Sequence, residues 1–246
     1  MKLISCNIEW DRHLDTVLPF IKETRPDVLC VQELFELDIP LFEEVIGGTG
    51  YFVPTMQKQT TRGTISEGIG VFSRLPRTNE RTLQYSGSVG AAYLHSEDPE
   101  TWDKDYELRA LAAADISFEG ESYRVLTTHF NWTKKGTSTP EQLQAMERML
   151  GLLKKEEPFV LAGDMNAPRG GETFSLIAEK YKDNIPQHYK TSIDIALHRA
   201  GQVDGEQLSR LMVDGLFTTP EYKVKNAELV FGISDHAAIV ATLEKL

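Results

Sequence analysis

Short apolar segments that end in a polar residue alternate with amphipathic segments along the whole chain, and this pattern restricts the fold more than any other feature. Residues 2–8 form a strand-like segment, and 28–32 is a continuous apolar run of the kind found in buried strands. Between them, one helical stripe of 14–24 carries four apolar residues: Leu14, Val17, Leu18 and Ile21. The alternation predicts an α/β protein.

The same alternation continues towards the C-terminus. Helices are expected at 39–46, 140–155 and 174–180. The second of them has the clearest start, because Thr139 is a favoured cap and Pro140 suits the first turn. Strands are expected at 51–54, 68–73, 109–118, 123–129, 158–162, 212–218 and 237–243. The stretch 77–108 shows the least pattern and is expected to be a long surface loop.

Length and charge limit the classes of protein that fit. The 246 residues suit one domain spanning 1–246, and 26 basic against 37 acidic residues give a net charge of −11. That charge argues against a large non-specific footprint on duplex nucleic acid, while a short single strand or a small phosphorylated substrate stays open. Cys6 and Cys30 lie in apolar segments and are expected to be buried free thiols.

No apolar run reaches the ~18 residues of a membrane helix. The first strand begins at residue 2, which leaves no room for a signal peptide. We therefore expect a protein without a membrane span. The expected free thiols favour the cytoplasm, and a monomer is expected.

The candidates for a functional site are the polar residues at strand ends. Asp164 and Asn166 lie two positions apart, so an extended backbone directs both the same way, and Gly163 allows a bend before them. Asp235 and His236 are adjacent just before the last strand. Adjacent side chains in a regular strand point to opposite faces, so this pair serves one site only where the strand is beginning.

Four further polar residues have a structural alternative beside the functional one. A lone buried amide such as Asn7, or a histidine such as His129, is usually a satisfied core residue. Glu33 closes the run 28–32, where a glutamate is rarely buried unless it is paired or bound to a metal, although it could also be solvated just past the sheet. Asp214 lies in an apolar strand and needs a partner, for which a histidine is a common choice.

The donor types indicate which metal suits this set. The sequence contains no His-x-x-x-His or Cys-x-x-Cys spacing, no Gly-x-x-x-x-Gly-Lys loop and no Gly-x-Ser-x-Gly elbow. The remaining candidates are rich in oxygen: Glu33, Asp164, Asp235, Asn7 and Asn166. Oxygen ligands of this kind suit Mg²⁺ or Mn²⁺. The sequence therefore predicts a shared polar site for a divalent metal and a phosphate.

Taken in order, these residues resemble the endonuclease/exonuclease/phosphatase superfamily. The matching motifs are Asn7 in Ser-Cys-Asn-Ile, Glu33 in Val-Gln-Glu-Leu, His129 in Thr-Thr-His-Phe, Asp164 and Asn166 in Gly-Asp-Met-Asn, Asp214 in Val-Asp-Gly-Leu-Phe, and Asp235-His236 in Ser-Asp-His. Six motifs in the same order across nearly the whole chain make the resemblance specific. It implies a four-layer αββα sandwich of two mixed β-sheets flanked by helices, with the site at one edge.

The resemblance also implies roles. The metal would be held by Glu33, Asp235 and Asn7. The catalytic residues would be Asp164, His236, His129, Asn166 and Asp214. Among them, Asp164 would deprotonate the attacking water and Asn166 would hydrogen-bond the phosphate or that water. His236 and His129 would donate to non-bridging oxygens, and Asp214 would hold His236 in one tautomer.

The implied function is a Mg²⁺-dependent phosphodiesterase or nuclease-type hydrolase. The segment around His129 resembles the histidine-bearing members, such as deadenylases, phosphodiesterases and sphingomyelinases, and 187–209 has no recognisable family pattern. A phosphomonoesterase of the same fold and a non-catalytic phosphate-binding module are the alternatives. Five cations in predicted loops either form a basic rim or are ordinary surface charges: Arg62, Arg74, Lys134, Lys135 and Arg169.

Overall fold

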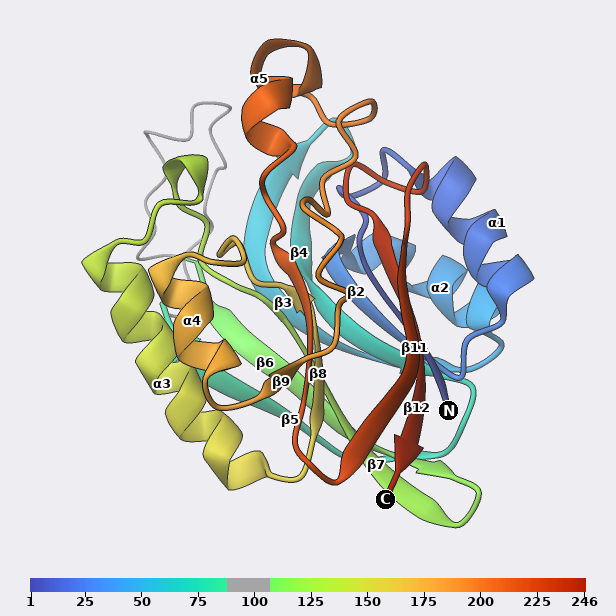
Figure 1. Cartoon of the computed structure of the whole chain (residues 1–246). Coiled ribbons are helices and arrows are strands. Elements are labelled where there is room, and N and C mark those ends of the chain that lie inside the picture. The colour runs from blue at the N-terminus through green and yellow to red at the C-terminus, as the bar shows by residue number, and fades with distance from the viewer. Residues whose placement is uncertain (88–106) are drawn as a thin grey trace.

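Two six-stranded mixed sheets pack face to face at the centre of the molecule, and helices cover both outer faces (Figure 1). This computed structural model describes residues 1–87 and 107–246. The predicted four-layer αββα sandwich is confirmed. Within those described ranges, no helix is both long and apolar enough to cross a bilayer.

The first sheet has the strand order β11-β12-β1-β2-β4-β3. Its strands are β1 (Lys2–Asn7), β2 (Val28–Phe35), β3 (Thr49–Thr60), β4 (Gly63–Ser73), β11 (Tyr222–Val230) and β12 (Ala238–Lys245). β1 runs parallel to β2 and antiparallel to β12. The chain termini both belong to this sheet and lie near each other in Figure 1.

The second sheet has the strand order β5-β6-β7-β8-β10-β9. Its strands are β5 (Arg77–Ser86), β6 (Arg109–Phe118), β7 (Glu121–His129), β8 (Val160–Asp164), β9 (Lys182–Asp183) and β10 (Asp214–Thr218). β7 and β8 are parallel, and β10 is antiparallel to β8. The expected hairpin between β6 and β7 is present, with its turn at 119–120.

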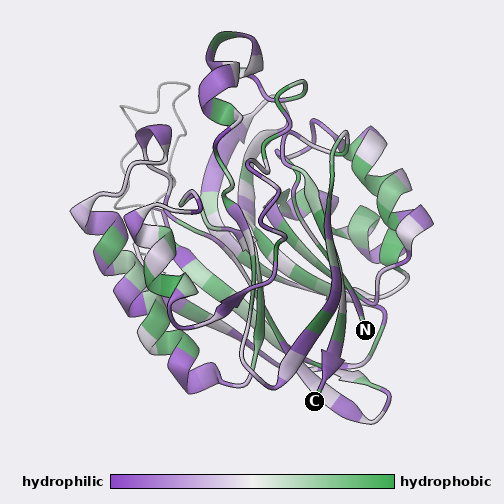
Figure 2. Ribbon diagram, viewed as in Figure 1, coloured by the Kyte–Doolittle hydropathy of each residue, from purple (hydrophilic) through white to green (hydrophobic). Residues whose placement is uncertain are grey.

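The helices are α1 (Leu14–Thr24), α2 (Ile39–Ile46), α3 (Pro140–Glu156), α4 (Glu172–Ala178) and α5 (Gly201–Leu208). α1 and α2 pack on the first sheet, and α3 and α4 on the second. α3 begins as predicted at Pro140, where the Thr139 side chain accepts a hydrogen bond from the Gln142 N–H at 3.2 Å. Figure 2 shows hydrophobic and hydrophilic residues alternating along α3, as expected for a helix with one buried face.

Three apolar layers connect the four structural layers. The layer between the sheets joins residues such as Leu3 and Val71 of the first sheet to Ala112 and Val125 of the second. The other two layers lie under α1 and α2 and under α3 and α4. Both cysteines are free and buried, as expected.

The prediction of a surface loop over 77–108 is wrong for its first part, which forms β5. Residues 88–106 of that stretch lie outside the described residues. β11 was not predicted from the sequence at all. Both are sheet-edge strands whose side chains are mostly exposed or half-buried, and β5 buries only Tyr85. Their strand geometry depends on backbone pairing to one neighbour rather than on an apolar pattern.

Candidate active site

The strand order brings the polar strand ends to one edge of the sandwich. In the first sheet Asn7 lies opposite Gln32 on the parallel strand β2, so Asn7 and Glu33 emerge side by side. In the second sheet Asp164 lies opposite His129 on β7 and opposite Asp214 on β10. β12 is antiparallel to β1, so the residues that precede β12 reach the same edge.

Glu33 reaches the site through an irregularity in β2. The pairing of β2 with β4 shifts register between Val31 and Leu34, and Glu33 has a φ of 55°. A positive φ is uncommon for a residue with a Cβ, and bulges of this kind redirect a side chain near functional sites. The Glu33 side chain is 18% exposed, so its carboxylate faces the cleft rather than bulk solvent.

Asp164 is at the centre of the polar cluster. Its Oδ2 lies 3.5 Å from His129 Nε2 and 3.9 Å from His236 Nε2, and its Oδ1 accepts a hydrogen bond from the Asn166 N–H at 2.8 Å. Burial raises the pKa of Asp164 to about 7, because the charged form loses its hydration. A carboxylate with this pKa can exchange a proton near neutral pH.

His236 and Asp214 form a hydrogen-bonded pair. His236 Nδ1 donates to Asp214 Oδ2 at 2.8 Å, which leaves Nε2 on the side of Asp164. Burial alone would lower the pKa of His236, but the carboxylates of Asp214 and Asp164 outweigh it and hold that pKa well above its usual value. The hydrogen bond to Asp214 therefore fixes the orientation of the ring, and the raised pKa favours its imidazolium form.

His129 lies on the other side of Asp164, with its Nε2 also 3.7 Å from Glu33 Oε1. Burial, with Arg109 and His236 nearby, lowers the pKa of His129 well below its usual value. Arg109 donates to the His129 carbonyl at 3.0 Å and fixes the strand end that carries the ring. The pKa values of the two histidines are thus shifted in opposite directions, which favours a neutral ring at His129 and a charged ring at His236.

The two amides act on neighbouring groups. Asn7 Nδ2 donates to Glu33 Oε1 at 3.0 Å and to Asp164 Oδ2 at 3.2 Å, while its Oδ1 accepts from the Glu9 N–H at 3.2 Å. Asn166 Nδ2 donates to the Phe130 carbonyl at 3.0 Å. In this arrangement Asn7 orients the two carboxylates through its nitrogen, and its predicted metal ligation stays a prediction.

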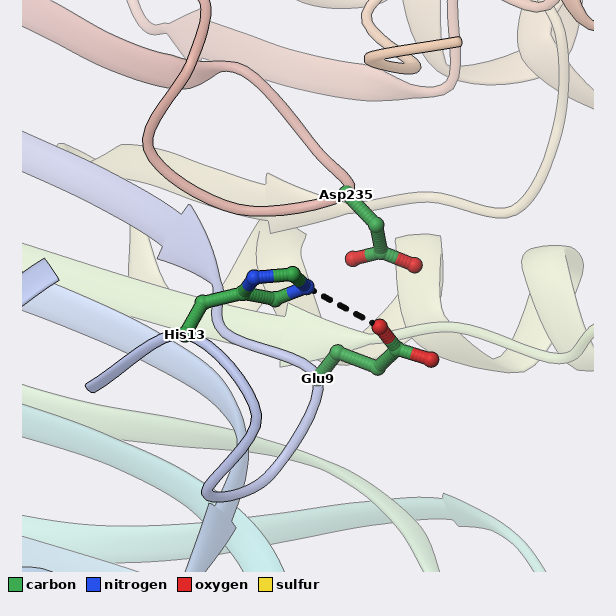
Figure 3. A group of neighbouring side chains, drawn as sticks. All are labelled: Glu9, His13 and Asp235. Atoms are coloured by element: carbon green, nitrogen blue, oxygen red, sulfur yellow. Dashed lines mark hydrogen bonds and ion pairs between the residues drawn. The ribbon is translucent and has the colours of Figure 1, made fainter. Parts of the chain in front are cut away.

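Asp235 lies close to two residues that sequence reasoning missed. Glu9 Oε2 is 3.1 Å from His13 Nε2, and Glu9, His13 and Asp235 each offer a ligand atom within 4.8 Å of the others (Figure 3). Burial raises the pKa of Asp235 to about 7. The available signals were the Asn-x-Glu spacing after β1 and the i, i+4 spacing of Glu9 and His13, but neither is specific by itself.

The region 187–209, which has no readable pattern, supports the site. The buried Ser192 Oγ accepts from the Asp214 N–H at 3.0 Å, and its carbonyl accepts from the Ala237 N–H at 2.7 Å. The Asp194 N–H donates to the Asp235 carbonyl at 2.8 Å. This segment therefore fixes both the strand end of Asp214 and the turn that carries Asp235 and His236.

A cleft of about 700 Å³ opens over these groups. All the predicted site residues except Asn7 and Asp214 line it, and those two lie directly behind the lining. Of the five loop cations, only Lys134 and Lys135 line the cleft. Arg62, Arg74 and Arg169 pair instead with acids that do not line the cleft, so for these three the basic-rim alternative is wrong.

The sequence match decides the family. The model of the endonuclease/exonuclease/phosphatase family matches residues 4–236. The chain belongs to this family. Comparison with curated protein sequences gives no significant match. Members of the family are hydrolases that generally use divalent metal ions, and this chain supplies candidate ligand groups for one.

Solved structures of low sequence identity share the fold. An endonuclease/exonuclease/phosphatase from Bacteroides vulgatus is 19% identical with a TM-score of 0.69, covering 100% of this chain and 98% of the other. The human Nocturnin catalytic domain with bound sulfate is 17% identical with a TM-score of 0.69, over 100% and 93%. A mannosyl-6-phosphatase from Bacteroides thetaiotaomicron VPI-5482 is 13% identical with a TM-score of 0.67, over 99% of each chain.

The site residues fit a divalent metal. Burial raises the pKa values of Asp164 and Asp235 to about 7, and repulsion from the Glu33 carboxylate adds to the shift of both. Glu9 and Glu33 bring two further carboxylates to the same cleft. A hard cation with oxygen ligands would offset this repulsion, as Mg²⁺ or Mn²⁺ does.

Proposed function

We propose that this protein is a divalent-metal-dependent phosphoesterase that hydrolyses phosphodiester bonds by in-line attack of an activated water. One observation carries the proposal. A buried carboxylate, Asp164, lies within 3.9 Å of two imidazoles with opposite pKa shifts, those of His129 and His236. This arrangement supplies a base and hydrogen-bond donors at one end of a cleft that also carries metal-type ligands.

Asp164 would accept the proton of the attacking water. Hydrogen bonds from the Asn166 N–H at 2.8 Å and from Asn7 Nδ2 at 3.2 Å fix the direction of its carboxylate. A pKa of about 7 brings its basicity close to that of an efficient general base at neutral pH. The side chain of Asn166 would hydrogen-bond the phosphate or the same water.

The two histidines would stabilise the negative charge that grows on the phosphoryl oxygens. His236 is charged and is oriented by Asp214 at 2.8 Å, so it would donate from Nε2 to a non-bridging oxygen. His129 is neutral and would donate one N–H from the opposite side of Asp164. Preorganised donors of this kind need no rearrangement as the charge develops.

Glu33 and Asp235, with Asn7, would hold Mg²⁺ or Mn²⁺, and Glu9 and His13 are within reach of the same position. When bound, the ion would polarise a phosphoryl oxygen and offset the charge of the leaving group. The bound cation would also relieve the repulsion among the cleft carboxylates.

The substrate would be a phosphate ester, either a short or single-stranded nucleic acid or a small phosphorylated molecule. A second candidate, a phosphomonoesterase, is favoured by the structural likeness to a mannosyl-6-phosphatase over 99% of both chains. The cations that line the cleft, Lys134 and Lys135 among them, would suit the doubly charged phosphate of a monoester.

A metal-supplemented substrate panel tests both candidates. EDTA-treated protein is assayed with and without Mg²⁺ or Mn²⁺ on bis-p-nitrophenyl phosphate, p-nitrophenyl phosphate, oligo(A) and abasic duplex DNA, with Asp164→Asn as the inactive control. We expect metal-dependent hydrolysis of the diesters that the variant lacks. Preferential cleavage of the monoester would select the second candidate, and hydrolysis that EDTA leaves intact would overturn the metal-dependent mechanism.

A further inference from the structure

Lys58, on β3, is a cation in the cleft wall whose hydrogen-bonding capacity is unfilled within the described part of the chain. Its side chain is 12% exposed, and its buried Nζ has no hydrogen-bond partner. Glu67 Oε2 lies 3.9 Å away, beyond hydrogen-bond distance, and also lacks a partner. The ammonium therefore lies near one carboxylate and one aromatic ring without a hydrogen-bond acceptor, and an entering anionic group would supply one.

Two arginines from other segments join Lys58 around one aromatic ring. Lys58 Nζ lies 2.7 Å from the centroid of the Trp10 ring, and the guanidinium carbons of Arg12 and Arg199 lie 5.4 and 5.5 Å from it. Arg12 follows β1 and Arg199 precedes α5, so segments far apart in sequence supply the three cations. All three line the same cleft as the proposed catalytic residues.

Glu9 holds the two arginines in place. Its Oε1 lies 3.0 Å from Arg199 Nε and 3.7 Å from Arg12 Nη1, and the Glu9 side chain is only 4% exposed. The arginine side chains stay 54% and 48% exposed, so both guanidiniums remain accessible to a ligand. One buried carboxylate thus anchors two accessible cations next to the proposed metal site.

The cationic groups around the Trp10 ring favour binding of an anion over stacking of a nucleobase. A stacked base needs an open aromatic face, and the Trp10 ring already contacts the Lys58 ammonium and stacks with Phe35 at 6.5 Å. Lys58 faces the buried Glu67 and the two arginines share the buried Glu9, so three cations stand against two acids at this point of a chain whose net charge is −11. Guanidinium and ammonium groups in this combination are suited to phosphate oxygens.

We propose that Lys58, Arg12 and Arg199 form a subsite for a second phosphate group, so that the substrate is a small ester carrying two phosphates. This assignment rests on the proposed function, because the first phosphate is the one that would be hydrolysed at Asp164. Lys58 acts as a specificity-determining residue in the subsite, and Glu9 positions the arginines.

Phosphonates test the subsite without turnover, because their carbon–phosphorus bonds resist hydrolysis. Calorimetry at fixed free Mg²⁺ measures the dissociation constants of propane-, butane- and pentane-α,ω-bisphosphonate, each against the monophosphonate of the same chain length. We expect the best-fitting bisphosphonate to bind roughly tenfold or more tightly than its monophosphonate, which is the gain from one charge-assisted contact. Lys58→Met should remove this gain and leave monophosphonate binding within about twofold.

Two variants separate recognition from structure. Lys225→Met makes the same chemical change on β11, where Lys225 pairs with Glu244 on the surface, and should keep the full gain. The double variant Lys58→Met with Glu67→Gln removes both unpartnered groups together, so it should fold and still lack the gain. Equal binding of the two ligand classes by the unsubstituted protein, or a gain that survives in a folded Lys58 variant, would overturn the subsite.

Failure of the subsite and failure of the proposed function give different results. If the protein hydrolyses phosphodiesters but binds both ligand classes equally, the function stands and the subsite is rejected. If it prefers bisphosphonates through Lys58 but hydrolyses no phosphate ester, the subsite stands as a binding site and the proposed function fails.

Discussion

Asp164 is the residue through which the proposed proton transfer would pass. Asp164→Asn keeps the size of the side chain and an oxygen that accepts the hydrogen bond from the Asn166 N–H, so we expect the variant to fold normally. We expect its kcat to fall by roughly 10²- to 10⁴-fold, the usual contribution of a general base. Steady-state kinetics with circular dichroism on the same preparation measures both, and near-normal turnover in a folded variant would exclude Asp164 as the base.

Deprotonation of His236 should determine the alkaline limb of the pH–rate profile. Its raised pKa keeps the imidazolium present to higher pH, so a rate that needs the charged ring falls as the pH rises through the folded-state pKa. Asp214→Asn removes the paired carboxylate at 2.8 Å and should move this limb to lower pH. NMR titration of the ring protons in metal-free protein should show the same downward shift.

His188 provides the control for that experiment. It lies on the exposed surface, so His188→Ala should leave the profile and the rate unchanged within about twofold. An alkaline limb that stays in place in Asp214→Asn would mean that another group controls it.

At the scale of elements, strands buried on both faces were predictable, whereas the edge strands β5 and β11 were not, and the edge strand β3 was predicted only over 51–54. β2 and β8 both begin with apolar residues, and their buried patterns match the prediction from the sequence. β5 and β11 pair with one neighbouring strand only and bury few side chains, so their sequences lack the apolar pattern that would predict a strand. The bulge that redirects Glu33 depends on the register with β4, which no local pattern in β2 encodes.

The candidate site likewise contains residues that could be predicted from the sequence and residues that could not. The strand ends that carry Asp164 and His129 could be placed because parallel neighbouring strands finish at a common edge. Glu9 and Lys58 could not be identified as site residues from the sequence, because their roles depend on contacts with distant segments. Glu9 contacts Arg199, and Lys58 contacts the Trp10 ring. Contacts of that kind follow from the tertiary packing and leave no periodic signal.

Two glycines in different elements should respond oppositely to alanine. A Cβ at Gly163 in β8 would lie 2.3 Å from the Thr128 carbonyl oxygen of the paired strand β7, whereas a Cβ at Gly151 on the exposed side of α3 would meet nothing within 4 Å. We expect Gly163→Ala to destabilise the protein by roughly 1–3 kcal/mol and to displace Asp164. Gly151→Ala should stabilise it by roughly 0.5–1 kcal/mol with unchanged activity.

Thermal unfolding and kinetics of the two variants test this contrast. For a chain of this length, 1 kcal/mol corresponds to roughly 2–4 °C in Tm. A Gly163→Ala protein with unchanged Tm and full activity would show that the β7–β8 spacing tolerates a methyl group and does not constrain Asp164.

At the scale of the whole molecule, the cleft carboxylates should make stability depend on pH and metal together. In the metal-free protein the pKa values of Asp164 and Asp235 are about 7, against about 3.9 for an unfolded aspartate, so the folded state binds more protons between these values. Stability therefore falls as the pH rises through this window. His236, with its raised pKa, acts in the same direction, and His129, with its lowered pKa, opposes them below about pH 6.5.

Protons and a divalent cation would compete for the same oxygens, so Mg²⁺ should raise the Tm more at about pH 8 than at about pH 6. Asp235→Asn removes one of these charges. It should raise the Tm of EDTA-treated protein at the higher pH and shrink the Mg²⁺-induced shift, while Asp15→Asn, in the exposed first turn of α1, should leave the Mg²⁺-induced shift unchanged. An equal Mg²⁺ shift in the unsubstituted and Asp235→Asn proteins would show that Asp235 takes no part in binding the ion. An equal shift at both pH values would show that Mg²⁺ does not compete with protons for the carboxylates of this cleft.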